Sequence, residues 1–191
     1  MKINWFPGHM TKALRTMEKE IKNIDVVVYV LDARAPTACL NPEFDKLIKD
    51  KPVLLILNKI DMADKNKILE EKVENEIKTH FKNKIEILFL NSTASGALKF
   101  VLQKINLLCE EKIHRNLAKN INSFIRAMVV GVPNCGKSTL VNNLCGRGKA
   151  ITGNKPGVTK GKQWVTISKN IQILDTPGTL YPNLENETFA R

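Results

Sequence analysis

The sequence predicts an α/β fold of three layers, with helices on both faces of a mostly parallel sheet. Several apolar, β-branched runs lack the alternation of apolar and polar residues that half-exposed strands show, as strands covered on both faces require. Helical stretches separate these runs, so strands and helices alternate along the chain. A glycine-rich loop at residues 131–138 lies between one such run and a helix, as phosphate-binding loops do. The 191 residues suffice for one domain with its own core.

The expected elements follow one another closely along the chain. A helix over 12–22, with Leu14, Met17 and Ile21 on one stripe, leads into the first strand. The expected strands are 24–32, 52–57, 85–90, 127–130, 163–167 and 171–174, and the other expected helices are 42–49, 64–81, 97–112 and 137–144. The last two strands flank a short Ser-Lys-Asn turn and are expected to form a hairpin. The otherwise parallel sheet then carries one antiparallel edge strand.

The sequence GVPNCGKS at 131–138 matches the phosphate-loop pattern G-x-x-x-x-G-K-[ST]. Gly131 and Gly136 let backbone N–H groups turn toward phosphate oxygens, and the following helix points its positive end at them. Lys137 is then predicted to reach the β- and γ-phosphates, and the Ser138 hydroxyl to ligate Mg²⁺. The same loop supplies the other predicted nucleotide contacts, Asn134, Cys135, Gly136 and Thr139. The alternative is a glycine-rich turn without a ligand.

Two further motifs complete the predicted triphosphate site. DTPG at 175–178 ends an apolar run, so Asp175 is placed to hold Mg²⁺ through water and the Gly178 N–H to meet the γ-phosphate. PGVT at 156–159 precedes this motif and makes Thr159 the predicted switch threonine, which closes on Mg²⁺. The alternative for DTPG is a simple turn.

NKID at 58–61 predicts a guanine site at the end of another apolar run. Guanine offers N1–H and an exocyclic amine, two donors that the Asp61 carboxylate can accept together. We expect Asn58 to brace the loop and contact N7, and the stem of Lys59 to cover the face of the ring. The alternative is a chance tetrapeptide in an ATPase.

Asn91 and Ser92 follow the next apolar run and are predicted to form a second base-contacting loop. The alternative is that they only cap the helix expected to begin at 97. The motifs therefore run base loop, second base loop, phosphate loop, switch threonine and DTPG, which is the order of a circularly permuted P-loop GTPase. Permutation preserves the site in space, because chain termini commonly lie close together.

Charge, cysteines and hydropathy restrict the partners and the compartment. Lys and Arg number 30 against 19 Asp and Glu, and the formal charge of +11 favours a polyanionic partner such as RNA. The alternative is the Lys-rich surface of a basic proteome. The four cysteines lack zinc-type spacing and are expected to be reduced. Without a signal peptide or an apolar run of about 20 residues, we expect a cytoplasmic monomer with no membrane partner.

WFPGHM at 5–10, DAR at 32–34 and the nucleotide motifs together resemble the circularly permuted GTPases of the ribosome biogenesis GTPase A family. The resemblance implies a Mg²⁺-dependent GTPase that binds rRNA and proteins of the large ribosomal subunit late in its assembly. Hydrolysis would be slow alone, stimulated by the subunit and followed by release. Family members also carry a helical C-terminal RNA-binding domain, which we expect to be absent because the sequence stops at Arg191.

The order of elements and motifs along the chain also predicts its division. Residues 1–22 are predicted to form an N-terminal segment with a helix packed on the GTP-binding domain at 23–191. Within that domain we expect a base-binding half at 23–111, a polar, basic connector at 112–125 and a phosphate and switch half at 126–191.

Catalysis departs from the Ras-like pattern, because Thr179 stands where a water-orienting Gln follows DxxG. The family assigns a candidate role to the motif histidine, His9, whose imidazole would orient or deprotonate the attacking water. The alternative is that 5–7 form an apolar staple with His9 at the helix cap. Asn134 resembles an asparagine that helps hold K⁺ in GTPases without the Gln, so K⁺ is an expected activator. The role of Arg34, in the DAR motif or as a surface ion pair, is left open.

A second class of function competes with this GTPase. Because the Gln is absent and the surface is basic, the chain is alternatively a nucleotide-gated RNA-binding module with little intrinsic hydrolysis. The enzyme interpretation depends on Lys137, Thr159 and the candidate His9, whereas the binding module needs only the nucleotide loops.

Overall fold

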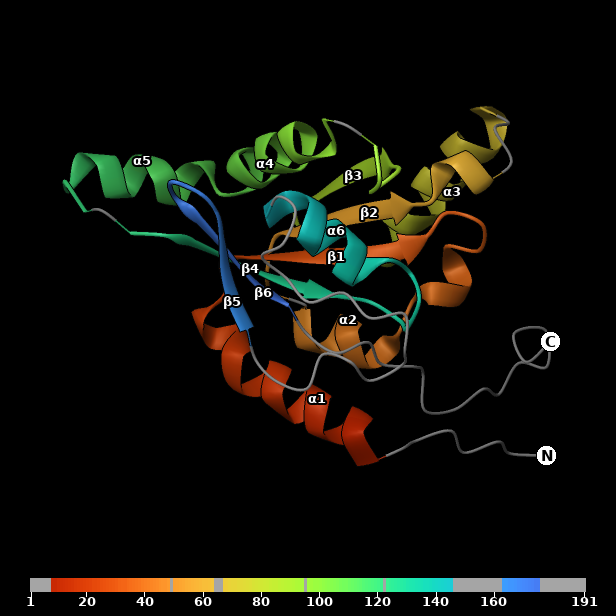
Figure 1. Ribbon diagram of the computed structural model, residues 1–191, viewed down its shortest axis with the longest axis horizontal. Coiled ribbons are helices and arrows are strands. Elements are labelled where there is room, and N and C mark those ends of the chain that lie inside the picture. The colour runs from red at the N-terminus through yellow and green to blue at the C-terminus, as the bar shows by residue number, and fades with distance from the viewer. Residues whose placement is uncertain are drawn as a thin grey trace.

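The computed structural model describes residues 8–48, 50–63, 67–94, 96–121, 123–145 and 163–175. Within them, six strands form one sheet in the order β3-β2-β1-β4-β6-β5, with helices on both faces (Figure 1). The strands are β1 (Val26–Asp32), β2 (Val53–Asn58), β3 (Ile85–Leu90), β4 (Ile125–Val130), β5 (Gln163–Ser168) and β6 (Ile171–Asp175). Every neighbouring pair is parallel except β5 with β6. The predicted mixed sheet with one antiparallel edge strand is therefore confirmed.

The described helices agree with the predicted ones except in one place. They are α1 (Gly8–Glu20), α2 (Pro42–Ile48), α3 (Lys67–His80), α4 (Ala97–Leu108), α5 (Glu110–Ala118) and α6 (Lys137–Cys145), with short 3-10 turns η1 (Ile21–Asn23), η2 (Thr37–Cys39) and η3 (Ile60–Met62). The helix predicted at 97–112 is two helices that meet at Cys109, and much of the predicted connector is helical. Acidic residues in the first turn of α5 and Arg115 in its last turn suit the helix dipole, which explains a helix in this polar segment.

The strands of the sheet centre are buried on both faces, as their unbroken apolar runs predict. Side chains of β1 alternate between two clusters: Val26, Val28 and Val30 lie in one, and Val27, Tyr29 and Leu31 lie in the other. The first cluster includes apolar residues of α4 and α6, and the second includes apolar residues of α1, α2 and α3. The sheet is thus the middle layer of three.

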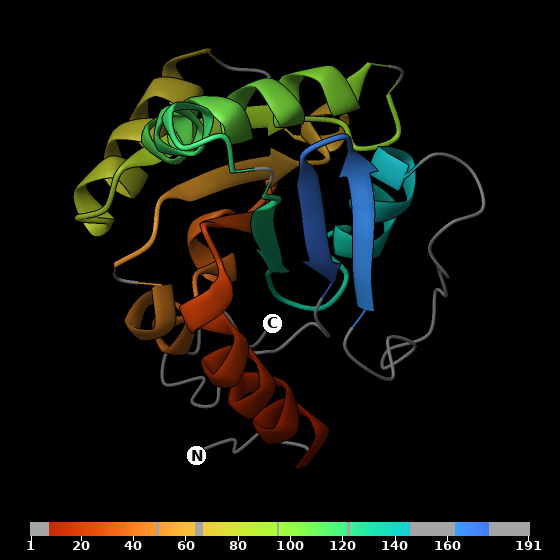
Figure 2. The ribbon, with the colours of Figure 1, turned by 90° about the vertical axis from the view of Figure 1, so that its left-hand side faces the viewer.

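Helix α1 lies against the second cluster, on the same side of the sheet as α2 (Figure 2). Met17 is 1% exposed, and Leu14 and Ile21 are partly buried beside the cluster. This is the stripe that the spacing predicts. The domain boundaries proposed along the chain stay predictions.

The sheet consists of two blocks of strands joined at a single seam. Strands β3, β2 and β1 are adjacent in space and in sequence, and β4, β6 and β5 form the other block. The seam is the parallel pairing of β1 with β4, from Val26 opposite Ala127 to Tyr29 opposite Val130. Because β2, β1 and β4 run in parallel, the loops after their carboxyl ends meet at one edge of the sheet.

Candidate nucleotide-binding site

The phosphate loop joins β4 to α6 at the seam and contains two glycines that the packing requires. Gly131 has φ +152° and Gly136 has φ +97°, both outside the range that other residues adopt readily. A Cβ at Gly131 would collide with the Val30 carbonyl oxygen, and one at Gly136 would collide with the side-chain amide of Asn58. The loop is therefore pressed against both the neighbouring strand and the predicted guanine loop.

Lys137 is the buried cation of this loop, with 6% of the residue exposed. Its Nζ donates to the carbonyl oxygens of Gly131 and Val132, at 3.0 and 2.9 Å. No carboxylate in the described part of the chain pairs with it. An ammonium has three donors, so one remains for a ligand. A buried, unpaired positive charge with a donor to spare fits an anion such as phosphate.

Two of the residues predicted to hold Mg²⁺ come from elements next to the phosphate loop, α6 and β6. Ser138 lies in the first turn of α6, and Asp175 ends β6 opposite Val129 of β4. A hydroxyl and a carboxylate that acts through water are oxygen groups of the kind that Mg²⁺ prefers. When bound, the ion would supply positive charge to the phosphates. The other predicted residues, Thr159 and Gly178, lie outside the described residues.

Asn58 connects three loops through one side chain. It ends β2, and the residue is 1% exposed. Its Nδ2 donates to the Cys135 carbonyl oxygen at 2.9 Å, and its Oδ1 accepts from the Ser92 N–H at 2.9 Å. Because a buried amide left without these partners would cost free energy, the three loops hold one another in place. Contact of Asn58 with guanine N7 stays a prediction.

Lys59 is held by a carboxylate that the sequence-based prediction missed. Its backbone is left-handed, with φ +63°, and its Nζ lies 2.9 Å from Asp32 Oδ2 and 2.6 Å from the Asn134 carbonyl oxygen. The ammonium therefore links the predicted guanine loop to the phosphate loop, while its stem stays available to cover a ring. The available signal was an acidic residue at the carboxyl end of the strand beside the NKID strand.

Arg34 forms a two-bond ion pair with the same carboxylate. Its Nε and Nη2 lie 2.9 and 2.7 Å from the two oxygens of Asp32. Burial raises the pKa of Asp32, but hydrogen bonds from Arg34 and Lys59 more than offset this and hold the pKa well below its usual range. Asp32 thus stays ionised and keeps Lys59 in place. Arg34 is an ion-pair partner here, which is one of the two roles left open for it.

The predicted guanine-reading residue, Asp61, lies in η3 and is exposed. The second loop is ordered by its own contacts: Asn91 Oδ1 accepts from the N–H and the hydroxyl of Thr93, at 2.9 and 2.6 Å. Neither Asn91 nor Ser92 caps α4, because the N-cap is Gly96 and it makes no side-chain cap bond. The capping alternative is therefore wrong. Contact of this loop with the base stays a prediction.

Asn143 of α6 is a second structural residue that the sequence did not single out. Its Nδ2 donates to the carbonyl oxygen of Ser92 and, at 3.4 Å, to that of Ala94. It joins the helix of the phosphate loop to the second base loop. A lone Asn inside a helix gives no sequence signal for such a contact.

The described cysteines Cys39, Cys109 and Cys135 are buried and free. Burial raises the pKa of the Cys135 thiol, so this residue of the phosphate loop is protonated and packs as a small apolar group. Burial also raises the pKa of Cys109, to about 11. Among the described side chains, no group of three His, Cys, Asp or Glu is arranged to hold a metal ion.

The N-terminal motif is only partly described. His9 lies in the first turn of α1, where the structure gives the backbone alone, and 5–7 lie outside the described residues, as does Thr179. The position of the His9 imidazole relative to the phosphate loop stays a prediction. No helix in the described ranges is long and apolar enough to cross a membrane.

Comparison with known proteins agrees with this geometry. A family model described as 50S ribosome-binding GTPase matches residues 126–191. Ribosome biogenesis GTPase A of Bacillus cereus is 41% identical over 98% of this chain and 62% of its own length. The Bacillus licheniformis protein of that name is 42% identical over 98% of this chain and 65% of its own length. The chain belongs to the ribosome biogenesis GTPase A family.

The relatives described here extend beyond bacteria and are longer than this chain. Mitochondrial ribosome-associated GTPase 1 of Xenopus tropicalis is 38% identical over 96% of this chain and 60% of its own length. The chain thus spans less than two thirds of the length of the curated relatives described here.

Two solved structures confirm the fold. The GDP-bound structure of TM YlqF has a TM-score of 0.60 and 30% identity, over 92% of this chain and 63% of the other. YjeQ from Thermotoga maritima has a TM-score of 0.52 at 17% identity, over 83% and 49% of the two chains, and shows the fold alone. With the observed order of the strands, these likenesses confirm the predicted fold class.

Proposed function

We propose that this chain binds GTP with Mg²⁺, hydrolyses it, and acts in late assembly of the large ribosomal subunit in the cytoplasm. In the GTP state it binds rRNA and proteins of the subunit, and hydrolysis releases it. The proposal that the chain binds GTP is supported above all by two hydrogen bonds, from Asn58 and Lys59, that link the NKID loop to the phosphate loop. The names of its relatives support the ribosomal part. We propose a monomer.

Each predicted residue has a role in this proposal. Asp61 reads the guanine edge, the stem of Lys59 covers the ring, and Lys137 neutralises the β- and γ-phosphates. Ser138 and Thr159 hold Mg²⁺ directly and Asp175 holds it through water, while the Gly178 N–H meets the γ-phosphate. His9 is the candidate that orients or deprotonates the attacking water. The remaining contacts come from Asn58, Asn91, Ser92, Asn134, Cys135, Gly136 and Thr139.

Purified large ribosomal subunits are expected to accelerate single-turnover GTP hydrolysis. The chain has Thr179 where the Ras-like Gln would stand, so the subunit must complete the arrangement around the water. The measurement is the rate of phosphate release with large subunits, with small subunits as the control, and with neither. Binding of large subunits without any increase in turnover would contradict the enzyme and favour the nucleotide-gated RNA-binding module.

Hydrolysis is expected to be faster in KCl than in NaCl at equal ionic strength. Asn134 of the phosphate loop has φ +62° and is exposed, and its backbone carbonyl is held by Lys59 while its side chain forms no hydrogen bond with another described residue. Its side-chain oxygen is thus available to a cation. The matched variant is Asn134→Gly, which permits the same backbone angle but removes that oxygen, and we expect it to lose the preference for K⁺. Equal rates of the unaltered protein in the two salts would contradict the K⁺ proposal.

A further inference from the structure

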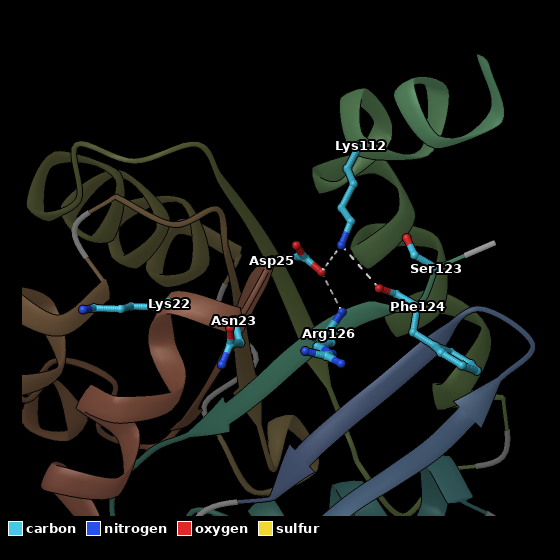
Figure 3. Close-up of a pocket in the computed structure, with 7 residues that line it drawn as sticks. All are labelled: Lys22, Asn23, Asp25, Lys112, Ser123, Phe124 and Arg126. Atoms are coloured by element: carbon cyan, nitrogen blue, oxygen red, sulfur yellow. Dashed lines mark hydrogen bonds and ion pairs between the residues drawn. The ribbon is translucent and has the colours of Figure 1, made fainter. Parts of the chain in front are cut away.

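An open pocket lies at the edge of the sheet opposite the nucleotide loops. It has a volume of about 540 Å³ and is lined by residues before β1, by residues before and at the start of β4, and by Lys112 of α5 (Figure 3). Because β1 and β4 are parallel, their amino ends lie together at this edge, away from the phosphate loop that follows β4. The nucleotide site described above uses none of the lining residues.

The lining of this pocket carries a net positive charge. Its one carboxylate, Asp25, is already satisfied: Oδ2 accepts from Lys112 Nζ at 2.6 Å and from the Arg126 N–H at 2.8 Å. Lys22 and the Arg126 guanidinium form no ion pair with any carboxylate in the described ranges. Two positive charges therefore remain for an anion from outside the chain.

The pocket combines this charge with aromatic surface. The Phe124 residue is 41% exposed, and its side chain extends on the same side of the pocket as Ser123 (Figure 3). The guanidinium of Arg126 lies 5.6 Å from the centre of the Trp164 ring. Stacking on an aromatic ring orients a guanidinium while leaving its N–H edge free for phosphate. In Figure 3 the Phe124 ring and the Lys22 ammonium extend to opposite sides of Arg126, so a strand laid across the pocket meets an aromatic ring for a base and cations for its phosphates in turn.

We propose that this pocket binds a single-stranded segment of RNA, with a base against Phe124 and phosphates at Arg126 and Lys22. The proposal rests on the proposed ribosomal function and specifies a surface for it. A duplex would present no unstacked base to Phe124, so single strands are preferred. Since the pocket lies at the far edge of the sheet from the phosphate loop, its own affinity for RNA is independent of the bound nucleotide, and the GTP dependence of subunit binding proposed above comes from other surfaces.

The test is the affinity of a fluorescein-labelled 12-nucleotide oligouridylate, measured by fluorescence anisotropy between about 50 and 200 mM salt. The double variant Lys22→Gln with Arg126→Gln is expected to bind about tenfold more weakly and to lower the salt slope by about one to two. Phe124→Ser is expected to lose about five- to tenfold affinity with little change of slope. Lys22→Glu, at an exposed residue outside the sheet, gives a second charge variant that leaves the strands unchanged.

The matched control removes two exposed lysines elsewhere, Lys72→Gln with Lys99→Gln, and is expected to bind almost as the unaltered protein does. An equal loss in this control would overturn the proposal, because diffuse charge would then explain the binding. Equal affinity for duplex RNA, equally good competition by polyglutamate, or a tenfold dependence on GDP against a GTP analogue would overturn it as well.

GTP hydrolysis with large subunits separates this proposal from the ribosomal function. If the pocket variants keep their oligouridylate affinity while subunits still accelerate hydrolysis, the pocket proposal fails and the ribosomal function stands. If the pocket variants lose RNA affinity but subunits never accelerate hydrolysis, the pocket stands and the assembly function fails.

Discussion

Lys137→Ala is expected to reduce GTP turnover by about three orders of magnitude or more. The ammonium is buried, donates to two carbonyl oxygens of the phosphate loop and has one donor left for phosphate. Alanine removes that charge and also leaves the Gly131 and Val132 carbonyls without their donor. The measurement is single-turnover hydrolysis of GTP, together with the affinity for a fluorescent GDP.

The control for this variant is Lys99→Ala, at an exposed residue of α4. It removes an equal charge outside the site and is expected to leave turnover unchanged. Thermal unfolding of both variants without nucleotide shows whether the loss of the two carbonyl contacts destabilises the fold. Turnover of Lys137→Ala at the rate of the unaltered protein would contradict the assignment of the phosphate loop.

Asp61→Asn is expected to weaken GTP binding about a hundredfold and to relax the preference for GTP over ATP. A carboxylate accepts from both guanine donors, but a carboxamide presents one acceptor and one donor, so its NH₂ opposes a guanine N–H. Loss of a charge-assisted hydrogen bond costs about 1.5–3 kcal/mol, which corresponds to this change in affinity. The measurement is competition of GTP and ATP against a fluorescent nucleotide.

Xanthosine triphosphate provides a more specific test of the role of Asp61. Xanthine carries a carbonyl oxygen where guanine carries the amine, so the Asn NH₂ can donate to it, and Asp61→Asn is expected to prefer this nucleotide. Asp61 is exposed, and the control Asp50→Asn changes another exposed carboxylate, which precedes β2 and so lies at the opposite end of that strand from the NKID loop. An unchanged selectivity for GTP over ATP in Asp61→Asn would contradict the guanine site and favour the ATPase interpretation.

The central strands were predictable because a strand that is buried on both faces has an unbroken run of apolar residues in its sequence. The same feature did not distinguish central from edge strands: β3 has an apolar run, but most of its residues are only half-buried, and its Glu86 pairs with Lys104 of α4. The helix α5 was missed because its apolar signal is short: Ile113 packs against the first cluster, whereas Leu117, one turn later, is 68% exposed.

The candidate site also contains residues that the sequence predicted and residues that it did not. The glycines, the phosphate-loop lysine and the NKID residues were predictable, because a short loop that contacts a nucleotide needs particular residue types at a fixed spacing. The contacts of Asp32 with Lys59 and of Asn143 with Ser92 were missed, since they depend on how distant segments meet in the fold. The acidic residue at the end of β1 marked a position but not its partner, and a lone Asn inside α6 marked neither.

The seam between β1 and β4 has a consequence for the chain while it is being synthesised. The block of β1, β2 and β3 emerges first, and β1 remains an open sheet edge until β4 has left the ribosome. Such an edge consists of apolar residues that are buried only in the folded protein. It is a site where a nascent chain aggregates or recruits a chaperone. A pause in translation at any point between β1 and β4 would prolong that exposure.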